Sequence, residues 1–382
     1  MIRVLFVFGT RPEAIKLAPV VRRLLENSQE FETRIAVTAQ HRGLLDQVLD
    51  AFALRPDHDL DLMHPGQTLS QSTSRIVAAL EPVLQKEQPH IVLVQGDTTT
   101  TLCGALAAFY AGVPVGHVEA GLRTGDLRQP FPEEMNRVLT SRLATLHFAP
   151  TEAAAANLRR ESVDSARVFV TGNTGIDAVL AIRDALEAGR LKPAQSIHLD
   201  SRKKLILVTA HRRESFGAGF ERIARALGRL AAREDVEVIY PVHPNPYVRE
   251  PILRILQNTA VRLIDPLPYV DFVDLMRRAH LLLTDSGGVQ EEAPSLGKPV
   301  LVMREKTERP EAVEAGTAVL VGTDEAKIQN EAILLLESPA EYQRRSRIHN
   351  PYGDGQASRR IEAGLLSYFN DFSLRTQHDS VR

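Results

Sequence analysis

Short apolar segments alternate with helical segments along almost the whole chain, and this alternation restricts the fold more than any other feature. The strand-like segments of the first half are RVLFVF, RIAVTA, HIVLVQGD, VPVGHVE, TLHFAP and RVFVTG. Segments with a helical repeat of apolar residues, such as EAIKLAPVVRRLLEN, lie between them. This pattern is typical of a parallel sheet that is covered by helices on both faces.

The alternation pauses at residues 187–204 and then starts again. This segment is polar, contains Gly and Pro and has no periodicity, so we interpret it as a linker between domains. The strand-like segments beyond it are KLILVTA, EVIYPVH, VRLIDPL, HLLLTDS, KPVLVM and AVLVGT. A chain of 382 residues is also long for a single core. We therefore predict an α/β fold of two Rossmann-like domains with a deep interdomain cleft, and a ligand site beyond the carboxyl ends of the strands.

Charge and cysteine content exclude several classes of protein. The formal net charge of -2 argues against a protein whose main partner is nucleic acid or an anionic membrane. Cys103 is the only cysteine, so the chain can form no internal disulfide and suits a reducing compartment. The apolar run at the N-terminus is too short for a signal peptide, and Gly112 and Pro114 interrupt the longest uncharged stretch. We expect a cytoplasmic enzyme or binding protein.

Motifs for common cofactors do not occur in the sequence. Neither GxGxxG nor GxxxxGK[ST] is found, so nothing supports a nicotinamide or a Walker-type ATP site. The histidines do not have the tight spacing of metal ligands such as HExxH. We expect no cofactor and no metal.

The segment FGTRPEAIKLAP follows the first predicted strand. Gly9 and Thr10 make a turn, and Pro12 suits the first turn of a helix. Arg11 and Lys16 therefore lie near the start of this helix, where cations oppose the helix dipole. An anionic ligand would explain them, and a solvated helix start is the alternative.

Three carboxylates stand at the ends of predicted elements in the first half. Asp97 follows a strand in VQGDTTTTL, Glu119 ends a strand in GHVEAG, and Glu133 starts a helix in PFPEEMNR. Carboxylates near one cleft suit acid and base chemistry, because neighbouring charges separate their pKa values. The structural alternatives are helix capping by Asp97 and a favourable helix dipole at Glu133 and Glu134.

Two histidines stand at strand ends in the second half. His211 lies in VTAHRRES, and His243 lies in YPVHPNP. The position favours a functional role for His211. The same indication is weaker for His243, because the prolines around it suit a structural turn.

The segment LLLTDSGGVQEEAPSLGKP combines a strand, a glycine-rich turn and a helix. Glycine removes side-chain bulk, so the backbone amides of Ser286, Gly287 and Gly288 can approach a diphosphate. Glu292 falls one helical turn later, within reach of ribose hydroxyls, and Arg309 can supply positive charge from another loop. The alternative is a glycine-rich turn before a solvated helix.

Taken together, these segments resemble the motifs of the non-hydrolysing UDP-N-acetylglucosamine 2-epimerase family. The matching segments, in the family's order, are FGTRPEAIKLAP, QGDTTTT, HVEAGLRT, PFPEEMNR, HRRESFG, DSGGVQEEAPSLGKPVLVMR and TERPEAVEAGT. The resemblance covers nearly the whole chain. It implies the glycosyltransferase-B architecture, with a first domain at 1–170, a UDP-binding domain at 171–356, and a helix at 357–372 that packs back on the first domain. It also implies a homodimer.

The resemblance implies interconversion of UDP-GlcNAc and UDP-ManNAc without a redox cofactor. UDP leaves by anti elimination as the C2 proton is removed, which gives 2-acetamidoglucal. UDP then adds back after protonation of the opposite face of C2. The expected partners are these UDP-sugars and UDP, with no nucleic acid and no membrane.

The resemblance also implies roles for single residues. Asp97, Glu119 and Glu133 match the family's catalytic carboxylates, and His211 is placed with them. The residues that match substrate-binding positions are Arg11, Lys16, His243, Phe272, Ser286, Gly287, Gly288, Glu292 and Arg309. Among these, Phe272 matches the aromatic residue beside the uracil and Glu292 the acid that binds the ribose. Gly43 is a departure, since many bacterial members have Gln there.

Other activities are compatible with the same motifs. A hydrolysing 2-epimerase would release ManNAc and UDP. A glycosyltransferase of this architecture would move the sugar to an acceptor, although no acceptor-binding insertion or membrane-docking helix is evident. A non-catalytic sensor of nucleotide sugars would not need the three carboxylates. A relative that acts on a uronic acid derivative of UDP-GlcNAc would have a very similar sequence.

Overall fold

The computed structural model describes residues 1–39, 42–62, 64, 66–307, 309–347 and 349–379, which form two compact units. Unit 1 consists of Met1–Ala178 and Gly353–Arg382, and unit 2 consists of Val179–Tyr352. Each unit is built around one wholly parallel sheet, so the prediction of two Rossmann-like α/β domains is confirmed. Among the described residues, no helix is both long and apolar enough to cross a membrane.

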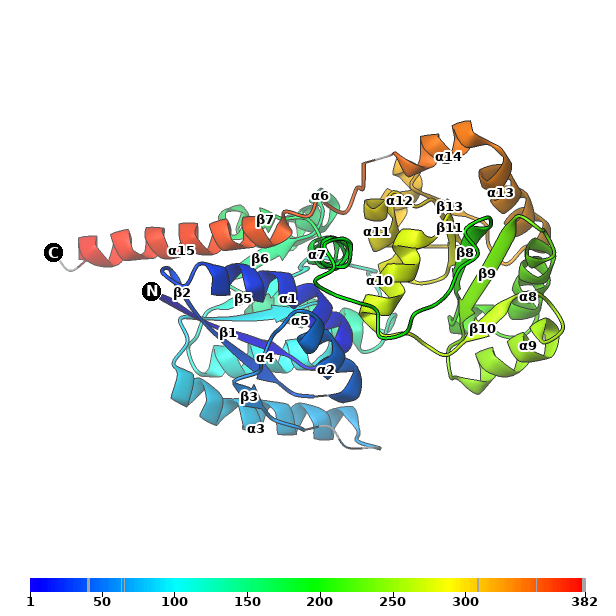
Figure 1. Cartoon of the computed structure of the whole chain (residues 1–382). Coiled ribbons are helices and arrows are strands. Elements are labelled where there is room, and N and C mark those ends of the chain that lie inside the picture. The colour runs from blue at the N-terminus through cyan, green and yellow to red at the C-terminus, as the bar shows by residue number, and fades with distance from the viewer. Residues whose placement is uncertain (40–41, 63, 65, 308, 348, 380–382) are drawn as a thin grey trace. The chain divides into compact units, whose positions relative to one another are not determined.

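The strands of unit 1 follow the order β3-β2-β1-β4-β5-β6-β7 (Figure 1). They are β1 (Ile2–Phe8), β2 (Phe31–Val37), β3 (His58–Asp59), β4 (Ile91–Gln95), β5 (Val115–Val118), β6 (Leu146–Ala149) and β7 (Val168–Val170). Every strand predicted for the first half is present. The two-residue strand β3 was not predicted, because it is too short to show a pattern.

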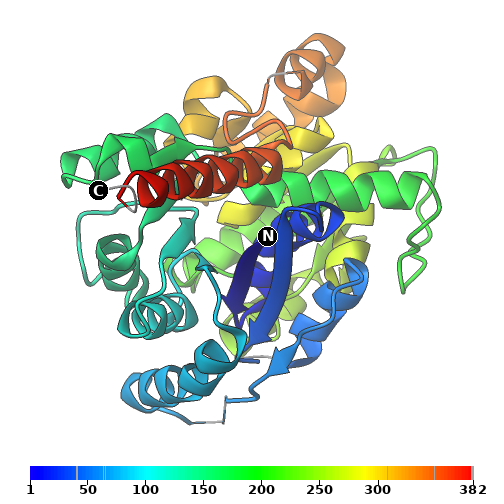
Figure 2. The same cartoon turned by 90° about the vertical axis from the view of Figure 1, so that its left-hand side faces the viewer.

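Helices cover both faces of this sheet. They are α1 (Arg11–Glu26), α2 (Arg42–Ala51), α3 (Leu69–Glu87), α4 (Thr99–Tyr110), α5 (Glu133–Leu143), α6 (Glu152–Arg160), α7 (Thr174–Glu187) and α15 (Ala357–Asp379). The chain returns to unit 1 at α15, which packs against α1 and β7 (Figure 2). On the other face, α3 and α4 pack together over buried β1 and β4 side chains such as Leu5 and Val94.

Local sequence explains where the helices that border the site begin. Pro12 lies in the first turn of α1, where its missing N–H is not needed. Thr98 caps α4, and its hydroxyl accepts a hydrogen bond from the N–H of Thr101 at 3.1 Å. Both helices therefore start at a defined residue directly after the end of a strand.

The strands of unit 2 follow the order β10-β9-β8-β11-β12-β13. They are β8 (Lys204–Thr209), β9 (Val236–Pro241), β10 (Arg262–Ile264), β11 (Leu281–Thr284), β12 (Val300–Val302) and β13 (Ala318–Leu320). The helices are α8 (Ala218–Ala231), α9 (Pro246–Leu256), α10 (Tyr269–Arg278), α11 (Gly287–Glu292), α12 (Pro310–Ala315), α13 (Glu325–Glu337) and α14 (Pro339–Ser346). All strands predicted for the second half are present.

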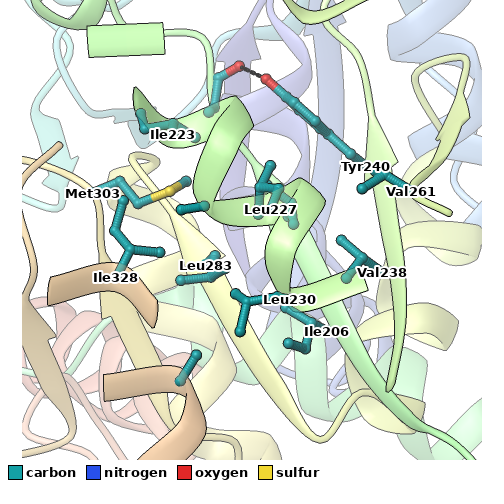
Figure 3. Close-up of a cluster of buried hydrophobic side chains, with 14 of the residues drawn as sticks. Ile206, Ile223, Leu227, Leu230, Val238, Tyr240, Val261, Leu283, Met303 and Ile328 are labelled. Atoms are coloured by element: carbon teal, nitrogen blue, oxygen red, sulfur yellow. Dashed lines mark hydrogen bonds between the residues drawn. The ribbon is translucent and has the colours of Figure 1, made fainter. Parts of the chain in front are cut away.

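The core of unit 2 lies between its sheet and helices α8, α9 and α13. Leu227 and Leu230 of α8 face Val238 and Leu283 of the strands, and all four are buried (Figure 3). Tyr240 is also wholly buried in this core, and its hydroxyl donates a hydrogen bond to the carbonyl oxygen of Ala210 at 2.7 Å (Figure 3). This bond satisfies the one polar atom of a large core side chain and holds the main chain directly before His211.

The passage from unit 1 to unit 2 falls inside α7. The polar segment 187–204 lies in unit 2 and does not connect the two units. Asp271 of α10 accepts hydrogen bonds from the main-chain N–H groups of Ala194 and Gln195, at 3.2 and 2.7 Å. A segment without periodicity is thus fixed by long-range hydrogen bonds, which local sequence does not reveal.

Candidate active site

The site residues of unit 1 gather where its strand order changes direction. Strands β1 and β4 are neighbours in the sheet, and the chain leaves them toward opposite sides. In parallel α/β sheets, ligands bind beyond the carboxyl ends of the strands at this switch point. Gly9 follows β1, and Asp97 follows β4 after Gly96.

Close packing requires the glycine that follows β1. A Cβ atom at Gly9 would lie 1.9 Å from Oγ1 of Thr38 and 2.8 Å from Oγ1 of Thr100. These two hydroxyls are themselves hydrogen-bonded, at 2.9 Å. Any side chain at this position would therefore displace these two threonine side chains or the turn that carries Arg11.

Glu13 is a buried carboxylate that the sequence analysis did not single out. Its Oε2 accepts hydrogen bonds from the N–H groups of Gly9 and Thr10, at 3.2 and 2.8 Å. Its Oε1 accepts hydrogen bonds from the hydroxyls of Thr98 and Thr101, at 2.8 and 3.2 Å. Burial raises the pKa of Glu13, although these hydrogen bonds oppose the rise. Glu13 thus joins the turn before Arg11 to the start of α4, immediately after Asp97.

Glu119 forms an ion pair with Lys16, and both side chains are largely buried. The backbone of Glu119 has φ of 64°, in the left-handed region that side chains other than glycine rarely adopt. Such a conformation costs roughly 1–3 kcal/mol and is found mainly at functional sites. The ion pair joins two residues that the sequence analysis had assigned separately to catalysis and to binding.

Asp97 faces Arg137 of α5, with 3.0 Å between Oδ2 and Nη2. The side-chain amide of Asn136 donates a hydrogen bond to the main-chain oxygen of Asp97 at 2.9 Å, so two adjacent residues of α5 hold it. Burial raises the pKa of Asp97 to about 6. Among the neighbouring charges, Arg137 has the largest effect and lowers the pKa of Asp97. Glu119 raises this pKa, Lys16 lowers it and Glu133 raises it. Electrostatically, the three predicted catalytic carboxylates thus form one group with two cations.

The neighbouring acids Glu133 and Glu134 have different environments. Glu134 is buried, and its Oε1 accepts hydrogen bonds from the N–H groups of Thr124 and Gly125, at 2.9 and 3.1 Å. Glu133 is partly exposed and acts on Asp97 through its charge. Glu134 therefore has a structural role, through hydrogen bonds to a loop and not through the helix dipole, while Glu133 stays accessible. Glu134 fixes the loop that precedes α5.

The site residues of unit 2 gather at the corresponding switch point, where β8 and β11 are neighbours. Asp285 follows β11 and is fully buried. Its Oδ2 accepts hydrogen bonds from the N–H groups of His211 and Arg212, at 2.6 and 2.7 Å. The rings of His211 and His243 are stacked, with 5.4 Å between their centroids. The structure thus brings the two predicted histidines together.

The glycine-rich turn is completed by charged residues. Arg309 is paired with the buried Glu291, and a Cβ atom at Gly287 would lie 3.6 Å from Nη2 of Arg309. The N–H of Ser286 donates to Oγ1 of Thr284 at 3.0 Å, so this amide is engaged within the turn. Glu292 is partly exposed, in contrast to Glu291. The two adjacent acids therefore divide into one that fixes Arg309 and one that is accessible.

Phe272 lies in α10 and is partly exposed. Among the described residues, no ring contact or side-chain hydrogen bond connects it to His211 or to Arg309. Its predicted place beside a base stays a prediction. In the part of the chain that the structure describes, no group of three or more His, Cys, Asp or Glu side chains is placed to hold a metal ion.

Three supporting residues were missed from the sequence, namely Glu13, Arg137 and Asp285. A signal existed for Asp285, which follows a predicted strand as Asp97 does. Arg137 lies one helical turn after Glu133, so it was a candidate for the same face of α5. Glu13 carried no signal of its own, because an acid in the first turn of a helix is common.

Comparisons with known proteins give a consistent result. The profile of the family described as UDP-N-acetylglucosamine 2-epimerase matches residues 23–366. A relative from Escherichia coli (strain K12), named UDP-N-acetylglucosamine 2-epimerase, is 58% identical over 369 residues, which are 95% of this chain and 98% of the relative.

Solved structures show the same similarity. UDP-GlcNAc 2-epimerase from Neisseria meningitidis, in a crystal structure bound to UDP-GlcNAc, is 48% identical with a TM-score of 0.87, over 96% of this chain and 100% of that chain. The glycosyltransferase SnogD from Streptomyces nogalater is 16% identical with a TM-score of 0.59, over 96% of this chain and 99% of that chain. The second likeness concerns the fold alone.

Proposed function

The chain belongs to the non-hydrolysing UDP-N-acetylglucosamine 2-epimerase family, and from this premise we propose how its residues divide the work of the reaction. The enzyme is an isomerase that interconverts UDP-GlcNAc and UDP-ManNAc. Unit 1 supplies the groups that move the C2 proton. Unit 2 is the UDP-binding domain, with the glycine-rich turn and the histidine pair as its contact residues.

The proposed reaction needs a proton acceptor and a proton donor for one carbon atom. One carboxylate removes the C2 proton, the electron pair forms the C1–C2 double bond, and the C1–O bond breaks as UDP leaves. The product is 2-acetamidoglucal. In the return step a protonated carboxyl group donates to the opposite face of C2, and a UDP oxygen attacks C1. The enzyme ends each cycle with the same total number of protons.

The arrangement around Asp97 is the observation that carries this proposal. A group works best as acid and base when its pKa lies near the working pH, and burial raises the pKa of Asp97 to about 6. Glu119 and Glu133 act on the same carboxylate, so one proton can be distributed within the group. Lys16 and Arg137 keep the group from carrying three uncompensated negative charges.

Departure of UDP develops negative charge on the diphosphate, which cations and hydrogen-bond donors stabilise. We assign this role to Arg309 and His211, with Gly287 and Gly288 allowing close approach of the main chain. Arg309 is suited to it because Glu291 holds its guanidinium against the glycine-rich turn. We assign binding of the ribose to Glu292 and binding of an anionic group to Arg11.

Proton NMR of the purified protein with UDP-GlcNAc in D2O, without added cofactor, tests the function directly. We expect UDP-ManNAc to appear with deuterium at C2. Free ManNAc together with UDP would instead indicate the hydrolysing reaction. If neither the sugar nor its C2 proton changes, the assignment to epimerisation of UDP-GlcNAc is wrong. A transferase that lacks its acceptor, a non-catalytic sensor or an enzyme for a modified sugar then takes its place.

We also propose that the protein forms a homodimer in which the two subunits meet at α3 and α4. A groove of about 1060 Å³ lies between these helices, and apolar residues such as Val77, Leu84 and Leu106 line much of it. Tyr110 also lines the groove and is 71% exposed, and its neighbour Phe109 is 58% exposed. A contiguous apolar surface of this kind is typical of a subunit interface.

The proposed location is the cytoplasm, which the single reduced cysteine supports.

A further inference from the structure

Asp285 has a feature that the proposed reaction does not use. It is 0% exposed, and its Oδ2 receives two main-chain hydrogen bonds from His211 and Arg212. Its Oδ1 is equally buried and has no hydrogen-bond partner among the described residues. A buried carboxylate oxygen without a donor is costly, so a role for it is expected.

The unpartnered oxygen faces one nitrogen of the His211 ring. Oδ1 lies 3.4 Å from Nδ1, which is within ion-pair range but longer than a charge-assisted hydrogen bond. The main chain on either side is fixed, because Asp285 binds the N–H of His211 and Tyr240 binds the carbonyl oxygen of Ala210. A small rotation of the ring would therefore complete the hydrogen bond between the two side chains.

The remaining surroundings of the ring are also defined. His243 stacks on one of its faces, and 38% of the His211 side chain is exposed. In an imidazole ring, Nδ1 and Nε2 flank Cε1, and their N–H bonds point in widely different directions. With Nδ1 directed at Asp285, Nε2 is the nitrogen available to a ligand.

We propose that Asp285 is a positioning residue that holds the Nδ1–H tautomer of His211, so that Nε2 takes up a proton when a nucleoside diphosphate binds. The inference rests on the proposed role of unit 2 in binding UDP. The proton comes from solvent, the imidazolium donates Nδ1–H to Asp285 and Nε2–H to a phosphate oxygen, and the proton returns to solvent when the diphosphate leaves.

The charges that face the ring support this sequence of events. Burial lowers the pKa of His211, and the charge of Asp285 raises it. Arg212 and His243 lower this pKa further. The ring is therefore neutral near pH 7 in the free protein. A diphosphate brings negative charge to Nε2 and raises the pKa, while Asp285 stabilises the cation from the other edge. Binding and protonation are thereby linked.

Calorimetric titration with UDP between pH 7.5 and 8.5 tests the linkage, because a terminal phosphate is already ionised in this range. For the wild-type protein we expect proton uptake on binding, measured in buffers of different ionisation enthalpy. The Kd should become tighter by up to roughly tenfold for each pH unit of decrease. Asp285→Asn should bind UDP more weakly and lose most of this pH dependence. The inference is wrong if the wild type takes up no proton, or if Asp285→Asn keeps the full uptake.

His243→Asn tests which of the two stacked rings takes up the proton, since it removes His243 and leaves Asp285 and His211 in place. It should bind UDP more weakly, because His243 is one of the assigned contact residues, and it should retain the proton uptake per bound UDP. Loss of uptake in this variant alone would identify His243 as the group and overturn the inference. Nitrogen NMR of the wild-type histidines gives a test that needs no variant to fold. We expect Nδ1–H for His211 in the free protein, and the Nε2–H tautomer would overturn the inference.

The two proposals can fail separately. UDP binding with proton uptake, but without epimerisation in D2O, would overturn the proposed function and leave this inference standing. Epimerisation together with pH-independent UDP binding would support the proposed function and overturn the inference about Asp285. If UDP does not bind at any pH, both are wrong.

Discussion

Arg137 lies 3.0 Å from Asp97, from Nη2 to Oδ2, although Asp97 lies in the turn after β4 and Arg137 lies in α5. The guanidinium lowers the pKa of Asp97, while burial and the charge of Glu119 raise it, and the result is about 6. A carboxyl group with this pKa can both accept and donate a proton near neutral pH. Burial, which Arg137 partly offsets, therefore explains why an acid that follows a strand is suited to reversible proton transfer.

Removing the charge of Asp97 or of Glu119 should abolish most of the activity. We expect Asp97→Asn and Glu119→Gln to lower kcat by roughly 10²–10⁴-fold, because general acid or base catalysis contributes about this much. UDP binding, measured by calorimetry, should change little, since we assign the nucleotide to unit 2. Glu152→Gln, an exposed acid of α6, serves as the control. Activity close to wild type in both variants would contradict the assignment.

The pH profile of kcat/KM should contain a limb near pH 6 that belongs to Asp97. If the rate-limiting step needs the carboxylate, activity falls below this pH. If it needs the acid, activity falls above it. Either way, Arg137→Met removes a cation that lowers the pKa of Asp97, so the limb should move to higher pH by roughly one unit or more.

Arg142→Met removes an exposed cation from the same helix and should leave the limb in place. A limb that stays at the same pH in Arg137→Met would show that the ion pair does not control Asp97. The shift is measured from initial rates at saturating and at low substrate concentration across the pH range.

Glu13→Gln should destabilise unit 1 and reduce activity together. The amide oxygen can accept from the main-chain N–H groups, but the N–H₂ group then faces the hydroxyls of Thr98 and Thr101, which now donate and would have to rotate to accept. The expected loss is roughly 1–3 kcal/mol in the free energy of unfolding, measured by urea titration. Glu26→Gln, at the exposed end of α1, should change stability by much less. Equal stabilities of the two variants would argue against a role for Glu13 in holding the turn.

A charge at the end of the groove between α3 and α4 should disrupt the proposed homodimer. We expect Tyr110→Glu to shift the protein to monomer in sedimentation velocity at micromolar concentration, because burying an unpaired carboxylate in an interface is costly. Leu253→Glu, on an exposed position of α9, should have no such effect. A wild-type protein that sediments as a monomer would remove the proposal altogether.

Sequence alone determined the two parallel-sheet units and the segments that carry the site. Strand-length apolar runs and turn residues depend on local properties of the chain, and most site residues were identified because they follow such runs directly. Asp97, Glu119 and His211 were found in this way. The same reasoning missed β3, because two residues are too few to show a pattern. It interpreted residues 187–204 as a linker, because long-range hydrogen bonds to Asp271 leave no local pattern.

Tertiary structure decided which charges act on which. Glu133 and Glu134 are adjacent and chemically identical, yet one is buried against main-chain N–H groups and the other is accessible. Glu291 and Glu292 divide in the same manner. The pairs Asp97 with Arg137 and Asp285 with His211 exist only because β4 lies beside β5, with α4 packed on α5, and β8 lies beside β11. Strand order brings distant residues together, and the burial that follows sets their pKa values. Neither is a property of any short segment.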